Sequence, residues 1–230
     1  MKILAINGSP KGASSNTDQI VKAFLEGAEL CGANSQIIYL KEKNVKPCIG
    51  CFSCWNKTPG KCVLNDDMND LLKKVSEADV LVFASPLYYF NVTAIMKLFI
   101  DRLLPLEYGG YISEKDENYM LNSKNKLRQN VLISNCGFPG IDNFSGLVET
   151  FKVMKNYPLS ATILRTQGEL LSQPDLKDFF AQYINTVKTA GSEFVNQGYI
   201  SSRTQSILNK DLVDPNLYSK IADNHLHAKQ

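Results

Sequence analysis

The chain has 230 residues, of which 44% are apolar and 21% are charged, and its formal net charge is +2. This length and composition are typical of an ordinary globular protein and argue against disordered, collagen-like and coiled-coil proteins. Because 25 basic side chains stand against 23 acidic ones, we expect no general attraction to nucleic acid or membranes, so a local site has to recognise any partner.

Short β-branched runs alternate with segments of helical period along most of the chain. The expected strands are residues 2–6, 36–40, 80–84, 130–134 and 161–164. The expected helices are residues 16–30, 67–78, 92–104, 144–156 and about 176–197. This alternation is the pattern of βαβ units, and it predicts a five-stranded parallel sheet with helices on both faces.

Two segments depart from this alternation. Residues 46–65 are rich in Cys, Gly and Pro, and a loop this long inside a compact domain usually has a function. Residues 196–230 are polar with scattered apolar side chains. We therefore expect one domain over 1–195 with an insertion at 46–65, and an extension over 196–230 that packs on the domain or forms an oligomer contact.

The chain shows no targeting or membrane signal. The apolar run at its start is too short for the core of a signal peptide. Residues 80–96 carry no charge, but Ser85 and Pro86 interrupt them, whereas a membrane span needs about 20 mostly apolar residues. We expect a cytoplasmic protein, in which six cysteines serve metal binding or redox chemistry rather than structural disulfides.

The loop after the first strand, residues 8–17, is rich in hydroxyl groups. It leads into a helix whose N-cap is Ser15 or Asn16. Backbone amides at that helix end, together with the loop hydroxyls, suit a single phosphate monoester. The patterns G-x-x-x-x-G-K-[ST] and G-x-G-x-x-G are absent, which argues against a triphosphate or dinucleotide site. A helix cap with surplus serines explains the same residues equally well.

Two more loops lie at the same edge of the predicted sheet, because the carboxyl ends of parallel strands face one way. Residues 85–91 include Tyr88, Tyr89 and Phe90, whose exposure is costly unless something planar or apolar, such as a flavin ring, covers them. Residues 135–140 contain glycines that permit close backbone approach to a ligand. Packing of the aromatic side chains beneath the next helix, and a simple turn, remain as alternatives.

The three loops carry motifs that resemble the flavodoxin-like flavoproteins, specifically the NAD(P)H-dependent FMN reductase group. The motifs are Gly8-Ser9-Pro10 with Ser15-Asn16-Thr17, Ser85-Pro86-Leu87-Tyr88-Tyr89, and Cys136-Gly137-Phe138-Pro139. The resemblance covers roughly residues 1–165. It implies a flavodoxin-like three-layer α/β/α sandwich with strand order 2-1-3-4-5, FMN as cofactor and NAD(P)H as a co-substrate. The implied phosphate-binding residues are Ser9, Lys11, Ser14, Ser15, Asn16 and Thr17. The residues that the resemblance places along the isoalloxazine ring are Pro86, Leu87, Tyr88, Tyr89, Phe90, Asn91, Asn135, Cys136, Gly137 and Phe138.

The most specific feature of the chain is Cys48-x2-Cys51-x2-Cys54-x7-Cys62. The x2 spacing lets a tight loop turn successive thiolates toward one centre, as in ferredoxins, whereas zinc sites usually show two separated C-x2-C pairs. The residues alone leave three readings open: an iron–sulfur cluster, zinc, or thiols without metal.

Inside a flavodoxin-like chain, this compact motif resembles the iron–sulfur flavoproteins, which carry FMN and a [4Fe-4S] cluster. The resemblance implies that Cys48, Cys51, Cys54 and Cys62 are the cluster ligands. It also implies a homodimer or homotetramer, because in that family the cysteine loop approaches the flavin of an adjacent subunit.

Several other residues are expected to have structural roles. We expect Cys31 to be a small buried hydrophobe, Trp55 to pack within the cysteine loop and Cys136 to contribute through its backbone. Asp101 and Arg102 are expected to form a solvated or helix-capping charge pair. No Ser/His/Asp constellation exists, so we assign no catalytic side chain.

Together these patterns predict an FMN-dependent oxidoreductase or electron-transfer flavoprotein whose partners are small-molecule or protein electron donors and acceptors. A flavin coupled to a [4Fe-4S] cluster would convert two-electron into one-electron transfer. The first alternative is an NAD(P)H-dependent FMN or quinone reductase without a cluster. A second alternative is a non-catalytic redox carrier or sensor. A third is a binding module that is stabilised by zinc and has no flavin.

Overall fold

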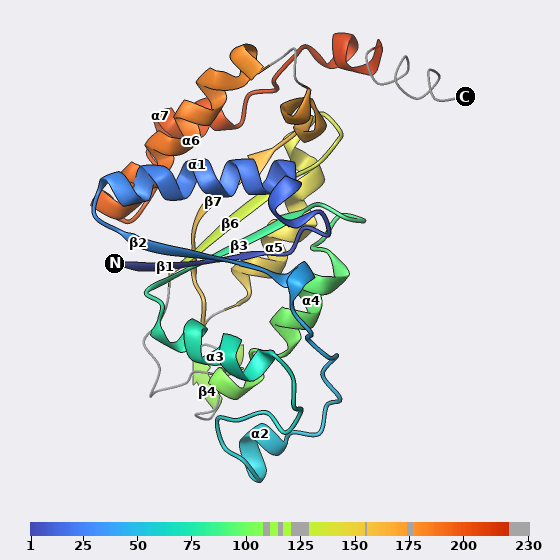
Figure 1. Ribbon diagram of the computed structural model, residues 1–230, viewed down its shortest axis with the longest axis vertical. Coiled ribbons are helices and arrows are strands. Elements are labelled where there is room, and N and C mark those ends of the chain that lie inside the picture. Colours follow the sequence, from blue (N-terminus) through green and yellow to red (C-terminus); the bar gives the residue numbers. More distant parts are fainter. Residues whose placement is uncertain (108–110, 115–116, 121–128, 155, 174–176, 221–230) are drawn as a thin grey trace.

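A five-stranded parallel sheet forms the centre of the computed structural model, which describes residues 1–107, 111–114, 117–120, 129–154, 156–173 and 177–220 (Figure 1). Its strands are β1 (Lys2–Asn7), β2 (Asn34–Tyr39), β3 (Val80–Pro86), β6 (Gln129–Asn135) and β7 (Leu159–Arg165). They lie in the order β2-β1-β3-β6-β7, and every neighbouring pair is parallel. Counted in chain order over these five strands, this arrangement confirms the predicted order 2-1-3-4-5.

Helices cover both faces of the sheet (Figure 1). One face carries α1 (Asn16–Leu30), α6 (Lys177–Gln197) and α7 (Ser202–Leu208), and the other carries α3 (Met68–Glu77), α4 (Ala94–Asp101) and α5 (Ser145–Lys152). Successive strand residues point to opposite faces. Val82 accordingly packs in the α1–α6 core, and Phe83 packs in the core under α3, α4 and α5. Burial on both faces explains why the strands are continuous apolar runs, and it confirms the three-layer prediction.

The ends of the helices follow local capping signals. Ser15 caps α1, because its Oγ accepts a hydrogen bond from the Asp18 amide at 3.1 Å. Thr93 caps α4 in the same way through the Met96 amide at 3.3 Å. The predicted helix over 92–104 is therefore too long at its start. It is also too long at its end, where the 3-10 turn Leu104–Glu107 follows.

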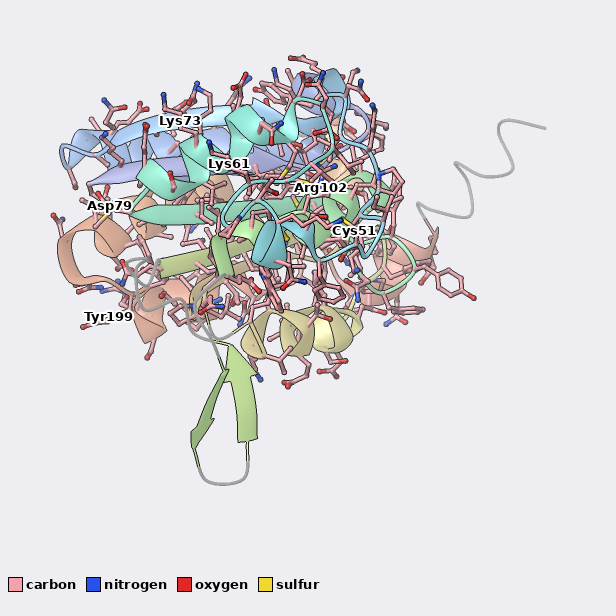
Figure 2. All side chains as sticks on the ribbon, turned by 90° about the horizontal axis from the view of Figure 1, so that it is seen from below. Cys51, Lys61, Lys73, Asp79, Arg102 and Tyr199 are labelled. Carbon is pink, nitrogen blue, oxygen red and sulfur yellow. The ribbon has the colours of Figure 1, made fainter. Side chains whose placement is uncertain are left out.

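Four short strands and helices were not predicted from the sequence. Strands β4 (Tyr111–Glu114) and β5 (Glu117–Met120) form an antiparallel hairpin that projects from the body of the molecule (Figure 2). The short helix α2 (Ser53–Asn56) lies within the cysteine-rich insertion, and α7 lies in the extension. Elements of four to seven residues are too short to give a reliable periodic signal. Within the described ranges, no helix has the length and apolar character needed to cross a lipid bilayer.

The described part of the C-terminal extension packs on the domain. Leu208 and Tyr218 are buried in the α1–α6 core. Arg165, at the end of β7, is buried with its guanidinium 4.8 Å from the centre of the Tyr183 ring, and it donates a hydrogen bond to the Leu208 carbonyl at 3.2 Å. Gln167 holds the next segment, since its Nε2 donates to the Val213 carbonyl at 3.0 Å. These contacts fix the extension against the end of the sheet.

Helices α1 and α6 approach each other closely at two glycines. A Cβ atom on Gly27 would lie 1.8 Å from the Lys188 carbonyl oxygen, and one on Gly191 would lie 1.9 Å from the Phe24 carbonyl oxygen. Backbone atoms cannot rotate out of the way, so an added methyl group has to separate the helices. We expect Gly27→Ala to lower the free energy of unfolding by about 3 kcal/mol, measured by urea denaturation.

Gly146→Ala provides the matched control, because Gly146 also lies in a helix but has room for a side chain. The nearest atom to a Cβ there is the Phe90 carbonyl oxygen, at 3.7 Å. Alanine costs less conformational entropy than glycine in a helix, so this variant is expected to match the parent protein or exceed its stability slightly. Equal stability of the two variants would contradict the close packing of α1 on α6.

Glu193 anchors the start of α7, and this contact predicts a pH dependence. Its carboxylate accepts hydrogen bonds at 2.8 Å from the Ser201 amide, the Ser201 hydroxyl and the Thr204 hydroxyl. Burial raises the pKa of Glu193, but these bonds outweigh it and lower the pKa below its ordinary value. The stabilisation is therefore complete above the unfolded-state pKa of about 4.3, and it is lost as the pH falls through the lower folded-state pKa.

We expect Glu193→Gln to lower the free energy of unfolding by about 1–2 kcal/mol at pH 7, because the amide cannot accept all the bonds that the carboxylate accepts. The difference from the parent protein should shrink toward pH 3, as the parent carboxylate takes up a proton. Urea denaturation at both pH values measures this difference. If the difference in the free energy of unfolding stays constant or grows in acid, the ionised carboxylate is not what stabilises α7.

Candidate functional site

Hydrogen bonds join the loops that follow β1, β3 and β6 at the carboxyl edge of the sheet. The Thr93 hydroxyl, after β3, donates to the Gly8 carbonyl, after β1, at 2.6 Å. The Thr17 hydroxyl, at the start of α1, donates to the Asn135 side-chain oxygen at 2.6 Å. The Leu87 amide donates to the Asn135 carbonyl at 2.8 Å. The three loops singled out in the sequence therefore form one continuous rim, as their positions predicted.

Buried polar side chains stiffen the loop after β1. Asn7 is fully buried, and its side chain accepts a hydrogen bond from the Ser9 amide at 2.9 Å and donates to Asp18 at 3.1 Å. Gly12 adopts a φ of 58°, the left-handed region that glycine tolerates best. The loop then enters α1, whose first turn carries the positive end of the helix dipole. This geometry suits an anionic ligand.

The six residues expected at the phosphate divide into two groups. Ser9, Ser15 and Thr17 are buried and hydrogen-bonded within the fold, so their side chains shape the loop. Lys11 and Ser14 are exposed and Asn16 is half-buried. The second group is therefore the one with side chains accessible to a ligand from solvent.

The loop after β3 is exposed, aromatic and strained. Tyr88, Tyr89 and Phe90 are 51%, 98% and 59% exposed. Tyr89 and Phe90 have φ values of 48° and 64°, a left-handed conformation that is costly for bulky residues. Two hydrogen bonds between the backbones of Tyr88 and Asn91, at 2.8 and 3.0 Å, close this turn. The alternative that the aromatic side chains pack beneath α4 is therefore wrong, and the exposure together with the strain is typical of a binding surface.

The loop after β6 adds a further aromatic side chain to the rim, because Phe138 is 69% exposed. Cys136 is buried, and burial raises the pKa of its thiol. Its amide donates to the Arg165 carbonyl at 2.9 Å, and its carbonyl accepts from the Gly168 amide at 2.7 Å. The Tyr218 hydroxyl donates to the Gly137 carbonyl, so the C-terminal extension also holds this loop in place.

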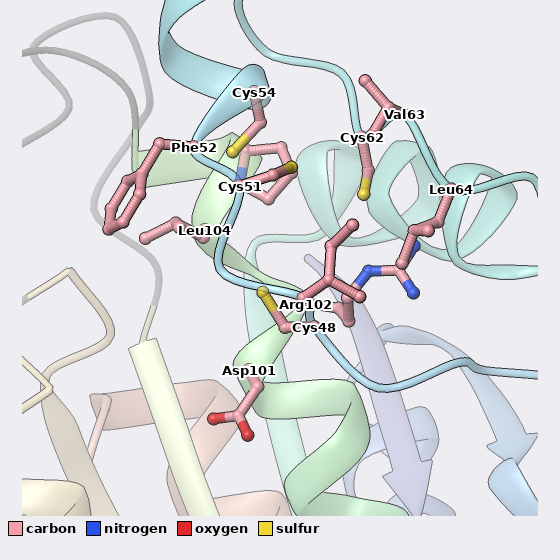
Figure 3. Close-up of a pocket in the computed structure, with 12 residues that line it drawn as sticks. Cys48, Cys51, Phe52, Cys54, Cys62, Val63, Leu64, Asp101, Arg102 and Leu104 are labelled. Carbon is pink, nitrogen blue, oxygen red and sulfur yellow. The ribbon is translucent and has the colours of Figure 1, made fainter.

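The four clustered cysteines line one pocket, at the end of α4 (Figure 3). Cys48 and Cys51 are exposed, Cys62 is half-buried and Cys54 is buried. Burial raises the pKa of the Cys54 thiol, and the neighbouring thiolates of Cys62, Cys51 and Cys48 act in the same direction. Hydrogen bonding to Ser53 lowers the pKa of the Cys51 thiol. The apolar residues around the thiols are Ile49, Phe52, Val63, Leu64, Leu104 and Pro105.

Four thiols around one pocket are a donor set that an iron–sulfur cluster or a zinc ion could use. A structural zinc ion draws four ligands to about 2.0–2.3 Å from one point. Among the described residues, no group of three or more His, Cys, Asp or Glu side chains is placed to hold a metal ion. A [4Fe-4S] cluster is a larger body that separates its four thiolates, and four cysteines around an apolar pocket supply the required ligands.

The expectation that Asp101 and Arg102 form a solvated or capping pair is wrong. Arg102 is 1% exposed and binds the buried Asp66 carboxylate with both terminal nitrogens, at 2.7 and 3.0 Å. It also donates to the Lys46 carbonyl at 2.7 Å. Asp101 instead pairs with Lys97 at the surface, at 2.6 Å. Because α4 ends at Asp101, Arg102 leaves the helix toward the cysteine loop (Figures 2 and 3).

Two smaller expectations also need correction. Trp55 does not pack within the insertion alone, because its indole nitrogen donates to the Leu104 carbonyl at 3.0 Å and so docks the insertion on the turn after α4. Cys31 is half-buried at the end of α1 rather than a buried hydrophobe, and it accepts a hydrogen bond from the Asn196 side chain at 3.4 Å. The last turn of a helix faces solvent more than its centre does, which explains this exposure.

Comparison with known proteins points to one family. A family model described as NADPH-dependent FMN reductase matches residues 1–128. An iron–sulfur flavoprotein of Methanocaldococcus jannaschii is 38% identical over 115 residues, which are 50% of this chain and 58% of that protein. One from Archaeoglobus fulgidus is 40% identical over 120 residues, which are 49% of this chain and 53% of that protein. The chain thus matches little more than half the length of these relatives.

Solved structures share the fold at low sequence identity. An FMN-dependent NADH-azoreductase from Bacillus anthracis, in complex with FMN, superposes with a TM-score of 0.61 at 20% identity, over 85% of this chain and 99% of that one. An NAD(P)H:quinone oxidoreductase from Methanothermobacter marburgensis superposes with a TM-score of 0.59 at 16% identity, over 84% and 96%. These matches agree with the flavodoxin-like order of the strands.

Proposed function

Because the chain belongs to the NADPH-dependent FMN reductase family, we propose that it is an FMN-dependent oxidoreductase with its cofactor at the rim formed by the loops after β1, β3 and β6. The observation that carries this proposal is the strained, exposed aromatic turn at Tyr88–Phe90, hydrogen-bonded into the same rim as the hydroxyl-rich loop. Such a surface is stable in water only at a cost, which a bound planar ring offsets.

The rim offers separate places for the two ends of FMN. Lys11, Ser14 and Asn16 bind the phosphate with side chains that are open to solvent, while the buried hydroxyls behind them hold the loop in shape. The residues proposed to line the ring are Pro86, Leu87, Tyr88, Tyr89, Phe90, Asn91, Asn135, Cys136, Gly137 and Phe138. Because the Cys136 thiol is buried, this residue contributes through its backbone.

FMN, when bound, takes up two electrons as hydride and releases electrons singly. The chain itself binds and orients the ring, and no side chain at the rim is assigned as nucleophile or general base. NAD(P)H is the proposed hydride donor, in keeping with the family description. The partners that we propose are small-molecule or protein electron donors and acceptors.

We further propose that Cys48, Cys51, Cys54 and Cys62 hold a [4Fe-4S] cluster. The four thiols line one pocket, and the aligned relatives are named iron–sulfur flavoproteins. Ile49, Phe52 and Val63, next to these cysteines, are 64%, 50% and 48% exposed. Exposed apolar side chains beside a redox site support a contact with a neighbouring subunit in a homodimer or homotetramer.

Anaerobic purification tests both proposals, followed by an absorbance spectrum and assays of FMN, iron and sulfide. We expect flavin bands with a broad additional shoulder, together with four iron and four sulfide per FMN. NADH or NADPH should bleach the flavin bands under argon. Flavin without iron would leave a reductase without a cluster, and a colourless protein that does not take up FMN would contradict the proposed function.

A further inference from the structure

Helix α4 connects the rim with the cysteine pocket. At its start, the Thr93 amide donates a hydrogen bond to the Ser85 hydroxyl at 3.0 Å, and the Thr93 hydroxyl donates to the Gly8 carbonyl. Directly after its end, Arg102 lines the pocket that the four cysteines surround. A helix of this length, 8 residues, is about 12 Å long. The two proposed redox sites are thus attached to opposite ends of one short rigid element.

Arg102 also joins the two ends of the cysteine-rich insertion. Its guanidinium binds the Lys46 carbonyl at one end and the Asp66 carboxylate at the other. Asp66 in turn accepts hydrogen bonds from the Lys46 amide at 2.9 Å and the Met68 amide at 3.1 Å. These bonds bring together the segments on either side of the four cysteines, so one buried ion pair closes the base of the loop.

One donor of this buried side chain lacks a partner. The Nε–H group of Arg102 is buried and makes no hydrogen bond to any of the described residues. Buried donors are nearly always satisfied, so an unpaired one calls for an explanation. Arg102 lines the pocket, whereas Asp66, which neutralises it, does not, so the ion pair presents its positive end to the thiols.

We propose that Arg102 is a positioning residue for the cluster: it closes the insertion through Lys46 and Asp66, and its Nε–H donates to a sulfur atom of the loaded site. This inference rests on the proposed [4Fe-4S] cluster. When a one-electron reductant such as dithionite reduces the cluster, the cluster and its four thiolates gain one negative charge. A buried positive donor at the pocket stabilises that reduced form and raises the reduction potential.

Three variants separate closure of the loop from the effect of charge. Arg102→Gln removes the charge and the forked contact with Asp66. Arg102→Lys keeps the charge but lacks both the fork and the Nε–H group. Lys97→Gln is the matched control, because it removes a positive charge from α4, just before Arg102 in the chain, at a side chain that is 58% exposed. Each is compared with the parent by hydrogen exchange of residues 46–66 before iron loading, by iron per FMN and by an EPR-monitored potential titration.

In Arg102→Gln, we expect the amides of residues 46–66 to exchange about tenfold faster or more. This variant should also hold less iron per FMN. The reduction potential of its remaining cluster should fall by at least about 59 mV, which is a tenfold change in the equilibrium constant for one electron. Arg102→Lys should keep more iron and have an intermediate potential, and Lys97→Gln should match the parent. FMN content, set at the other end of α4, reports on folding. If Arg102→Gln also loses FMN, its fold is disturbed. The same three measurements on Arg102→Lys then test the proposal.

The outcomes distinguish this inference from the proposed function. A parent protein that holds the cluster, with Arg102 variants that equal it in exchange, iron and potential, would overturn the role of Arg102 alone. A parent protein with no iron or sulfide after anaerobic reconstitution would overturn the cluster and this inference together.

Discussion

Cys54→Ser is expected to remove iron and sulfide from the protein while FMN remains bound. Cys54 is the most buried of the four clustered cysteines, at 7% exposure, and the other three surround the same pocket. A serine hydroxyl is a poor ligand for iron in a cluster that needs four thiolates. The rim that we propose for FMN is built from other loops, so the flavin should be retained.

Iron, sulfide and FMN assays after anaerobic purification measure this result, and the shoulder beside the flavin bands should disappear with the iron. Cys31→Ser is the control, because it makes the same change at a half-buried cysteine at the end of α1, and it should keep the parent ratio of iron to FMN. A Cys54→Ser protein with the parent amount of iron would rule out the proposed ligand set.

Ser14→Asp is expected to weaken FMN binding about a hundredfold while riboflavin binding stays unchanged. Ser14 is exposed in the loop after β1, and its hydroxyl donates only locally, to the Lys11 carbonyl at 2.9 Å. A carboxylate there would face the FMN phosphate. At an effective dielectric constant of about 20, two unit charges about 5 Å apart repel by about 3 kcal/mol, and riboflavin lacks the phosphate.

Flavin fluorescence titrations of the flavin-free protein give both affinities. Ser206→Asp adds the same charge at an exposed serine on α7 and should change neither affinity. An equal loss of affinity for FMN and riboflavin would mean that the variant disturbs the fold of the loop. An unchanged affinity for FMN would place the phosphate elsewhere.

Much of the fold could be predicted because its signals are local. The predicted helix over 16–30 has the bounds of α1, since Ser15 caps it and its apolar residues recur at helical spacing. The alternation of strands and helices along the chain was enough to predict a parallel sheet with helices on both faces. The β4–β5 hairpin was missed because each of its strands has only four residues. So short a segment does not show a clear alternation of apolar and polar side chains.

The meeting of the three loops could be predicted from the sequence, but the contacts of individual side chains could not. Serines, aromatic residues and cysteines at fixed spacings marked the loops, and strand order brought those loops together. The contact of Arg102 with Asp66 crosses 36 residues, and that with Lys46 crosses 56; no local pattern encodes such pairs. The left-handed backbone at Tyr89 and Phe90 was likewise hidden, because no glycine marks the turn.

A crystal structure of the protein purified and crystallised anaerobically tests the central proposal most directly. We predict FMN at the rim, with its phosphate against the loop after β1 and its ring beside Tyr88–Asn91 and Asn135–Phe138. A rim filled by the protein's own side chains, in crystals grown with excess FMN, would contradict the account.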